Sequence, residues 1–574
     1  MSPEVHQLRS ELYRAAVKLD DLCLFNAAKW ATEALQGLVP SEEAFDYTPS
    51  ELSAEEKQDR VSFMLAKNYF NCKEFERAAH TLRNCVSGDA LFLRLYSMYI
   101  SIDKKATEDT DGSVNTVQLQ SMLKQSDTSE SEHRYQIVDE LNSSLGKIMV
   151  EIDQYHEKAE ENAHLQFLAG LTYNKKKKHQ MAQERLFASV KLFPYNWSCW
   201  QELIATIPTF EEAQVFLLQV RKKEPAFASH VMFQFFEVVL LQEFYQQSAT
   251  FSEKVTSLIE LFPSFVFLKV QNFLVAYHGL DYFQAEQMFD EIIAKDPLRL
   301  DDLDTYSNML YVMEKKSKLS YLAHYASQVD NFRSETCCIV ANYHSMKGEH
   351  EKAIMYYRRA LLLNKNCLSA WTLMGHEFVE LKNSHAAIES YRRAVDINAK
   401  DFRAWYGLGQ AYEVLDMHLY ALYYYQRATN LQPMDKRMWQ AIGNCYEKID
   451  KLEEAVRSFE KALAIDSLNE VDTEGGEPHV SIEPHICYKL ATISEKLGRS
   501  KETYRFMRMC LEQEFDWGLS DETSKARLWL ARHALENQRF NEAYDLAKEF
   551  NFNNAHDVEE ARAIAKDARG RMTY

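Results

Sequence analysis

The sequence predicts an all-α fold, an α-solenoid in which stacked antiparallel helix pairs form a superhelix. A motif in the second half of the chain returns after 34 residues, since Trp371 and Trp405 occupy matching places in two copies. Apolar residues within each copy recur with the spacing of one helix face. The 574 residues include 11 prolines and 16 glycines, a low content that favours long helical stretches.

The first helix of each copy is predicted from apolar residues at unit positions 4, 7, 8 and 11, which share one helix face. Trp371, Met374, Gly375 and Phe378 form such a set. Seven copies follow one another without a gap, beginning at residues 232, 266, 300, 334, 368, 402 and 436.

The second helix is predicted from a small residue at position 20 and an aromatic residue at position 24, such as Ala421 and Tyr425. Antiparallel helices about 8 to 10 Å apart leave room for only a methyl group where they cross, and the ring fills the widening gap one turn later. Proline at position 32, such as Pro433, ends this helix. These marks resemble the tetratricopeptide repeat.

Weaker copies extend the array at 59–92 and 163–196, and a further pair is expected near Gln7. The polar segment 104–134 has no sustained apolar face, so we predict a mostly disordered insertion. The predicted segments are: N-terminal repeats 1–103; the insertion 104–134; a helix and degenerate repeats 135–231; seven contiguous repeats 232–469; a surface loop 470–483; C-terminal repeats 484–557; a C-terminal tail 558–574.

Composition argues against several classes of function. A formal charge of -19 argues against nucleic-acid binding, which needs a basic surface. The most apolar segment, from Val231, is interrupted by Gln234 and Glu237, so no membrane contact is expected. Ten scattered cysteines without a C-x-x-C pair indicate reduced, buried thiols, and we expect no metal and no cofactor.

No active site can be assembled from the sequence, so we predict that the chain is not an enzyme. The segment GLGQ at 407–410 begins like a dinucleotide-binding motif, but it lies inside a predicted first helix and lacks a third glycine. The segment HEFVE at 376–380 lacks the second histidine of a zinc-protease helix.

Function is therefore expected on surfaces, above all on the concave wall that the first helices would line as a groove. Position 9 carries an amide or histidine in five consecutive units, which could bond the backbone of an extended peptide or simply cover a solvated wall. The sequence leaves both open. The candidate groove residues are Asn342, Glu377, Asn308, Tyr311, His376, Glu380, Tyr406, Gln410 and Glu413.

The carboxylates Glu377, Glu380, Glu413 and Glu447 favour a basic peptide, because a carboxylate can take an arginine through two charge-assisted bonds. A chaperone co-factor that clamps acidic peptide C-termini is the alternative. It would need lysines and arginines in the groove, where we expect Tyr406 and glutamates.

Several segments carry more than the repeat marks, among them KDPLRLDDLDTYSNMLYV, the SYLAH run at 320–324 and the paired Cys337 and Cys338. They resemble the subunit 8 family of the anaphase-promoting complex, the multisubunit ubiquitin ligase of mitosis. The resemblance is close over about 266–469, looser upstream to about 163, and elsewhere limited to repeat order.

The resemblance implies a noncatalytic scaffold in the nucleus and cytoplasm that supports cell-cycle protein degradation. It implies a homodimer formed by the N-terminal repeats, contacts with other tetratricopeptide-repeat and scaffold subunits, and a groove that receives an arginine-containing motif of a β-propeller coactivator. In the family an asparagine and a glutamate of adjacent repeats hold that arginine, and the matching motifs ANYHS and GHEFV contain Asn342 and Glu377.

For the dimer, we expect an interface that buries apolar faces in the N-terminal repeats. Closed twofold symmetry is the usual arrangement of homo-oligomers. The expected apolar faces surround Tyr69, Phe70, Leu95 and Tyr96.

Overall fold

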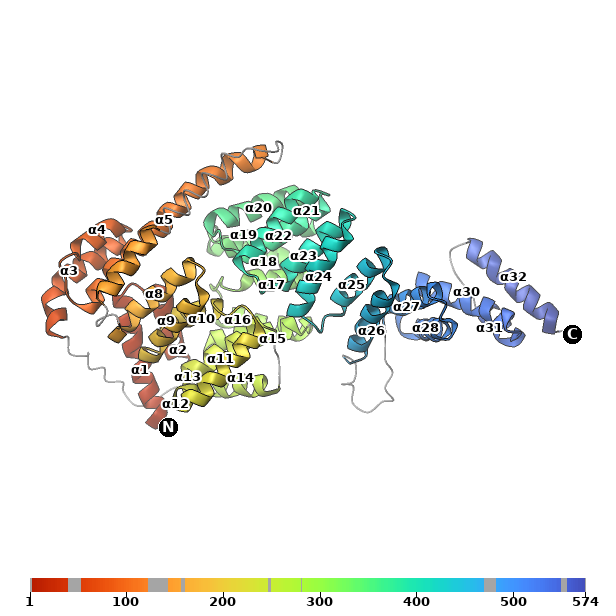
Figure 1. Ribbon diagram of the computed structural model, residues 1–574, viewed down its shortest axis with the longest axis horizontal. Coiled ribbons are helices and arrows are strands. Elements are labelled where there is room, and N and C mark those ends of the chain that lie inside the picture. Colours follow the sequence, from red (N-terminus) through yellow and green to blue (C-terminus); the bar gives the residue numbers. More distant parts are fainter. Residues whose placement is uncertain are drawn as a thin grey trace. The chain divides into compact units, whose positions relative to one another are not determined.

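A computed structural model describes residues 3–39, 53–121, 143–155, 160–245, 249–279, 281–468, 482–548 and 555–572. Regular secondary structure in these ranges is entirely helical, so the predicted all-α fold is confirmed. The chain forms two compact units, Met1–Met313 and Glu314–Tyr574, each built largely from antiparallel helix pairs (Figure 1).

The first unit contains the helices that precede residue 314, together with helical residues 143–154. Their bounds are α1 (Pro3–Asp21), α2 (Phe25–Gly37), α3 (Ala54–Asn71), α4 (Phe75–Thr81), α5 (Gly88–Ser121), α8 (Ala163–Lys175), α9 (His179–Leu192), α10 (Trp197–Ala205), α11 (Phe210–Lys223), α12 (Pro225–Ala228), α13 (Val231–Glu243), α14 (Ala249–Leu261), α15 (Val266–His278), α16 (Tyr282–Lys295) and α17 (Leu303–Val312).

The second unit continues the repeat period, and its first helices begin close to where the 34-residue spacing places them. Its helices are α18 (Lys316–Val329), α19 (Ser334–Met346), α20 (His350–Leu363), α21 (Leu368–Glu380), α22 (Ser384–Ile397), α23 (Phe402–Val414), α24 (His418–Leu431), α25 (Lys436–Lys448), α26 (Leu452–Leu468), α27 (Pro484–Lys496), α28 (Ser500–Glu512), α29 (Glu514–Trp517), α30 (Asp521–Glu536), α31 (Phe540–Lys548) and α32 (Ala555–Met572).

In three consecutive repeats a tryptophan at position 4 binds the turn that leads into the first helix. The indole of Trp371 donates to the carbonyl of Lys365 at 3.0 Å, and the indole of Trp405 donates to the carbonyl of Ala399 at 2.8 Å. Both bonds reach back six residues to the preceding turn. The half-buried ring packs against the core while its N–H satisfies a backbone acceptor, a bond that phenylalanine could not make.

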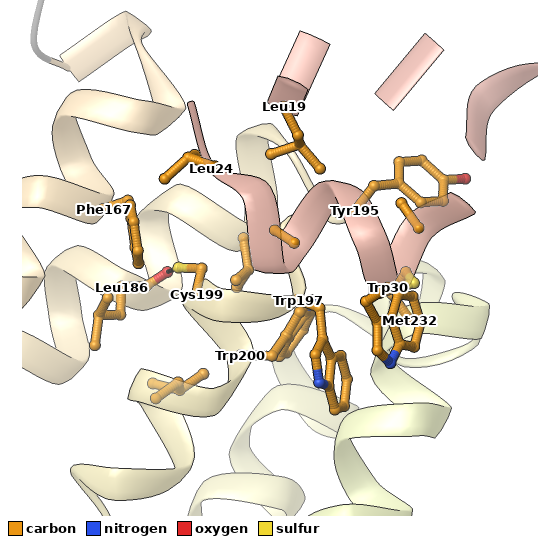
Figure 2. Close-up of a cluster of buried hydrophobic side chains, with 14 of the residues drawn as sticks. Leu19, Leu24, Trp30, Phe167, Leu186, Tyr195, Trp197, Cys199, Trp200 and Met232 are labelled. Carbon is orange, nitrogen blue, oxygen red and sulfur yellow. Dashed lines mark hydrogen bonds between the residues drawn. The ribbon is translucent and has the colours of Figure 1, made fainter. Parts of the chain in front are cut away.

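In the first unit, the N-terminal pair α1–α2 folds onto repeats that lie far along the chain. The Trp30 ring on α2 stacks on Trp197 of α10 at 4.7 Å between centroids (Figure 2). Its edges meet Phe235 of α13 and Phe265 just before α15. Gly37 lies so close to Phe265 that an added Cβ would be 2.5 Å from the Phe265 Cβ. These contacts were not predicted from the repeat period.

Two of the four residues named for the expected dimer interface are buried inside the first unit, whereas Tyr69 and Tyr96 are half-buried. Phe70 and Leu95 are buried in the core of the unit. The Phe70 ring stacks on Tyr96 at 5.8 Å and meets Phe75 edge-on at 5.1 Å. The physical reason is that α4 is short, so that α3 packs directly against α5.

Two other predicted segments differ from the structure. Helix α5 continues to Ser121 and so includes the first part of 104–134, where we expected disorder. The segment contains no proline, and a helix that is already nucleated extends at little cost. The rest of that segment lies outside the described residues, as does the expected loop 470–483 apart from Ile482 and Glu483.

The expected C-terminal tail 558–574 forms most of helix α32. Ala561, Ile564 and Ala568 follow helical spacing and are buried against neighbouring helices. Their small size made this apolar stripe weak in the sequence. It is sufficient because α30 and α31 present the matching small residues Ala531 and Ala547.

Candidate functional site

The predicted site residues lie on the first helices of successive pairs. Asn308 and Tyr311 lie on α17 of the first unit, where Asn308 is buried and Tyr311 is partly exposed. The others belong to the second unit, and we call the part of α19, α21 and α23 that carries them the first-helix face. They are Asn342 on α19, His376, Glu377 and Glu380 on α21, and Tyr406, Gln410 and Glu413 on α23.

Tyrosine hydroxyls from the second helices bind polar groups of this face. The hydroxyl of Tyr357 donates to Oδ1 of Asn342. Asn342 is only 2% exposed. The Tyr425 hydroxyl donates to Oε2 of Glu413 at 2.6 Å. Asn342 is therefore buried and oriented, and it does not merely cover a solvated wall. The Tyr357 hydroxyl therefore sets the orientation of the amide.

His376 follows the same pattern one repeat later. Its Nδ1 lies 2.8 Å from the hydroxyl of Tyr391, and the two rings meet edge-on at 5.4 Å. Burial lowers the pKa of His376 to about 4, with a smaller contribution from the charge of Arg403. The imidazole is therefore neutral near pH 7 and serves as a neutral hydrogen-bonding group in this row.

Glu377 joins two adjacent repeats. Its Oε1 accepts a hydrogen bond from the Ser345 hydroxyl of α19 at 2.6 Å, and its Oε2 lies 2.8 Å from Nδ1 of His350 at the start of α20. Glu377 is only 5% exposed. Ser345 is one helical turn after Asn342, so the structure brings Asn342 and Glu377 to the same junction between α19 and α21.

The sequence did not point to Ser345 or His350 as parts of this junction. Ser345 occupies position 12, on the same helix face as position 9, and a polar residue there was a weak signal. His350 is the first residue of a second helix, a class of position that we did not connect with the groove. Both groups hold the Glu377 carboxylate in a fixed orientation.

The expected acidic wall is largely satisfied by the chain itself. Glu380 is exposed at the end of α21, but Glu413 accepts from Tyr425. Glu447 pairs with Lys489 at 2.9 Å and with Lys496 at 2.7 Å. Burial raises the pKa of Glu447, but the two lysines outweigh burial and lower the pKa overall. A buried carboxylate requires such partners, which the repeat pattern alone did not reveal.

Other features of the described residues bear on alternative functions. Among them, no group of three or more His, Cys, Asp or Glu side chains is arranged to hold a metal ion. No described helix is both long and apolar enough to cross a membrane. All ten cysteines are free thiols, and the Sγ atoms of Cys338 and Cys367 lie 3.8 Å apart.

Comparison with known families gives matches along most of the chain. The family described as anaphase promoting complex subunit 8 / Cdc23 matches residues 7–273. General tetratricopeptide-repeat families match residues 334–367, 375–415 and 436–467. The family-specific match thus covers the N-terminal part, where we had found the resemblance weakest. Regular repeats follow the general pattern, whereas the irregular N-terminal pairs carry features of one family.

Individual relatives agree with this family match. The anaphase-promoting complex subunit CDC23 of Saccharomyces cerevisiae is 39% identical over 99% of this chain and 99% of its own length. The anaphase-promoting complex subunit 8 of Arabidopsis thaliana is 34% identical over 66% of each chain. The human cell division cycle protein 23 homolog is 33% identical over 56% of this chain and 49% of its own.

A solved structure supports the fold. The crystal structure of the APC/C hetero-tetramer Cut9-Hcn1 is similar with a TM-score of 0.50 and 14% identity, covering 90% of this chain and 96% of the other. At that identity the similarity concerns the arrangement of helix pairs alone.

Proposed function

Because the chain belongs to the subunit 8 family of the anaphase-promoting complex, we propose that it is a noncatalytic scaffold subunit of this ubiquitin ligase. In this proposal it holds other repeat and scaffold subunits. It also receives an arginine-containing motif of a β-propeller coactivator at the junction of α19 and α21. It thereby supports cell-cycle protein degradation, and the cell-division names of its relatives support this role. We place it in the nucleus and cytoplasm.

The observation that carries the groove proposal is the Glu377 junction. A carboxylate has about four acceptor positions. Ser345 and His350 engage one position on each oxygen, which leaves acceptor capacity for a guanidinium. The carboxylate is held at 5% exposure, where charge-assisted bonds are less screened by water than at the surface. Arginine suits this site because its planar fork can bond both oxygens.

Asn342 supplies orientation in this proposal. Tyr357 fixes the amide through Oδ1, so the plane of the Asn342 side chain is set by the core of its own repeat. Asn342 lies one turn before Ser345, which binds the Glu377 carboxylate, and this spacing supports a shared role for the amide and the carboxylate. A charged group and a fixed amide together select both the charge and the direction of an entering side chain.

The alternative, a chaperone co-factor, receives less support. Such a clamp would present cations to a peptide carboxylate. The residues that we described on the first-helix face offer Glu377, Glu380, an amide and a neutral histidine. Family membership also favours the scaffold role.

The test measures binding of a fluorescent coactivator peptide that carries the arginine to the full chain. Glu377→Gln removes the charge but keeps the side-chain shape, and loss of a charged hydrogen bond costs about 1.5 to 3 kcal/mol. We expect binding to weaken about ten- to a hundredfold. Replacing the peptide arginine by lysine should weaken binding to the wild type and have less effect on the variant.

The control is Glu351→Gln, which removes an exposed carboxylate of α20 in the repeat that carries Asn342. It should bind like the wild type. Circular dichroism should show unchanged helix content in both variants. Equal affinity of wild type and Glu377→Gln for the arginine peptide would refute the groove assignment.

A further inference from the structure

Exposed apolar side chains cluster on the turn between α23 and α24 and on the exposed face of α24, in the second unit. Figure 1 labels both helices. We call this cluster the α24 patch. Its members are between 47% and 67% exposed. They are Val414, Met417, Leu419, Tyr420 and Tyr423. Single exposed apolar residues are common, but a contiguous group of this kind marks an interaction surface.

The neighbouring repeat shows that these positions ordinarily face water. The α24 patch occupies unit positions 13, 16, 18, 19 and 22. In the next unit the same positions are all charged, namely Lys448, Lys451, Glu453, Glu454 and Arg457. The packing of a helix pair therefore does not require apolar side chains there. Their presence in one repeat calls for an explanation outside the fold of that repeat.

The aromatic members of the α24 patch rest on an ordered layer of rings. Tyr420 and Tyr424 both stack on Tyr412 of α23, at 5.6 and 5.2 Å between centroids. Tyr412 is held in turn by Arg392, whose Nη2 donates to its hydroxyl at 2.7 Å. Rings that are already ordered lose little conformational freedom on binding, which favours their use as anchors.

Charges stand at the two ends of the α24 patch. Asp416 lies in the turn before α24 with a side chain 95% exposed. Arg427 lies on α24 about two turns after Leu419. Its guanidinium is 5.5 Å from the centre of the Tyr423 ring. The distance along α24 from its first residue to Arg427 is about 14 Å. An occupant that presents a cation at one end and a carboxylate at the other would match this arrangement.

We propose that the α24 patch receives an amphipathic helix of another subunit of the same assembly, lying along α24. Its apolar face covers the five apolar side chains, while a basic residue meets Asp416 and an acidic residue meets Arg427. A helix fits because an exposed helix face offers ridges into which the side chains of a second helix pack. The proposal rests on membership of the assembly and is independent of arginine binding at Glu377.

The first experiment is hydroxyl-radical footprinting of the purified native assembly and of the isolated full chain. We expect labelling of Met417, Tyr420 and Tyr423 to fall at least fivefold in the assembly, while exposed Met355 on α20 serves as an internal reference. Equal labelling of the α24 patch in both samples would overturn the proposal. Low labelling already in the isolated chain would also overturn it, because the chain itself would then cover the patch.

The second experiment exchanges the outer face of α24 for that of the next repeat, through Leu419→Glu, Tyr420→Glu and Tyr423→Arg. These side chains are compatible with the fold at the same positions of α26. We expect at least a tenfold loss of one other subunit when the assembly is purified through a tag on a third subunit. The control exchanges Glu454→Arg and Arg457→Glu on α26 and should retain all subunits.

The identity of the occupant is read from a photo-crosslinker placed at Tyr420 in the assembly. A crosslinked peptide from another subunit, with apolar residues at helical spacing and charges of both signs, supports the proposal. A crosslink to a second copy of this chain, or to a proline-rich extended segment, overturns it. Unchanged subunit content in the exchanged variant, with normal helix content by circular dichroism, also overturns it.

Discussion

At the scale of single residues, the tyrosine at position 24 links the core to the polar face in three consecutive repeats. The ring of Tyr425 lies against Gly409, where an added Cβ would be 2.4 Å from ring carbons. The hydroxyl of the same residue donates to Glu413 on the first-helix face. The pair Tyr391 and Gly375 repeats the close approach, with 2.6 Å to the nearest ring carbon. The packing of the Tyr425 ring on Gly409 therefore also sets the position of the hydroxyl that binds Glu413.

This close packing predicts that Gly409→Ala destabilises the second unit. The added methyl group would overlap the Tyr425 ring, and overpacking of this kind costs about 1 to 3 kcal/mol. Thermal unfolding of the full chain should show a lower midpoint. The control is Gly570→Ala on α32, where an added Cβ meets nothing within 4 Å, and this change should not lower the midpoint. Equal midpoints for the two variants would contradict the assigned packing.

The low pKa of His376 predicts a pH-dependent stability. Its pKa is about 4 in the fold against 6.5 in the unfolded chain, so the unfolded chain binds the proton more readily. Stability should therefore fall as the pH falls from about 6.5 towards 4. We expect His376→Asn, which carries the amide found at the same position of neighbouring repeats, to lose less stability over this range. If the midpoint of thermal unfolding falls by the same amount in wild type and variant between pH 6.5 and pH 4, this role is refuted.

The sequence allowed part of the candidate site to be predicted. Register placed Asn342 in the row at position 9, whereas its pairing with Glu377 came from the resemblance to the family. In the structure Glu377 binds Ser345, which lies one turn after Asn342. The burial of both candidate residues could not be predicted, because it depends on Tyr357, Ser345 and His350 from other helices. A one-dimensional period identifies which face a residue occupies, but it does not identify the hydrogen-bond partner that another helix contributes.

At the scale of helices, regular pairs were predicted well and irregular ones were not. The small residue and the ring at positions 20 and 24 determine how two helices cross, so the pairs from α19 to α26 follow the period. The short helix α4, the long helix α5 and the terminal α32 depart from it. Their lengths depend on packing against neighbours outside the repeat, on which the local pattern has no bearing.

Helix α32 provides a test of such packing. Ile564 is 7% exposed and packs in a small cluster with Leu528, Ala531 and Ala547. Ile564→Ala should cost about 2 to 5 kcal/mol of local packing, if the site does not collapse. Because α32 is terminal, we expect it to detach locally, with faster hydrogen exchange in 555–572. The control Lys566→Ala changes an exposed residue of the same helix. Unchanged exchange in Ile564→Ala would show that α32 is held by other contacts.

At the scale of the whole molecule, long-range contacts of the N-terminal pair distinguish this chain from a plain array. Trp30 is surrounded by rings from α10, α13 and α15 within the first unit. Helix α3 also carries an apolar stripe that no other part of the described first unit covers. Val61 is 80%, Met64 54% and Leu65 44% exposed. These residues share one face of the helix, which makes them the better candidates for a dimer interface.

We expect the isolated chain to form a homodimer through this α3 stripe. Light scattering should give twice the chain mass of 67.0 kDa. Val61→Glu combined with Leu65→Glu should halve the measured mass, because two buried charges would be placed in the interface. Val215→Glu on α11 changes another exposed apolar residue and should leave the mass unchanged. A wild-type monomer at micromolar concentration would contradict the dimer.

The central claim is that the junction of α19 and α21 receives an arginine of the coactivator. The most direct test is a density map of the purified native assembly with its coactivator bound, at a resolution that shows side chains. We predict a guanidinium within hydrogen-bond distance, about 2.7 to 2.9 Å, of the Glu377 carboxylate and beside the Asn342 amide. A map in which the coactivator is bound and ordered, while its arginines lie elsewhere and Glu377 contacts only Ser345 and His350, would contradict the claim.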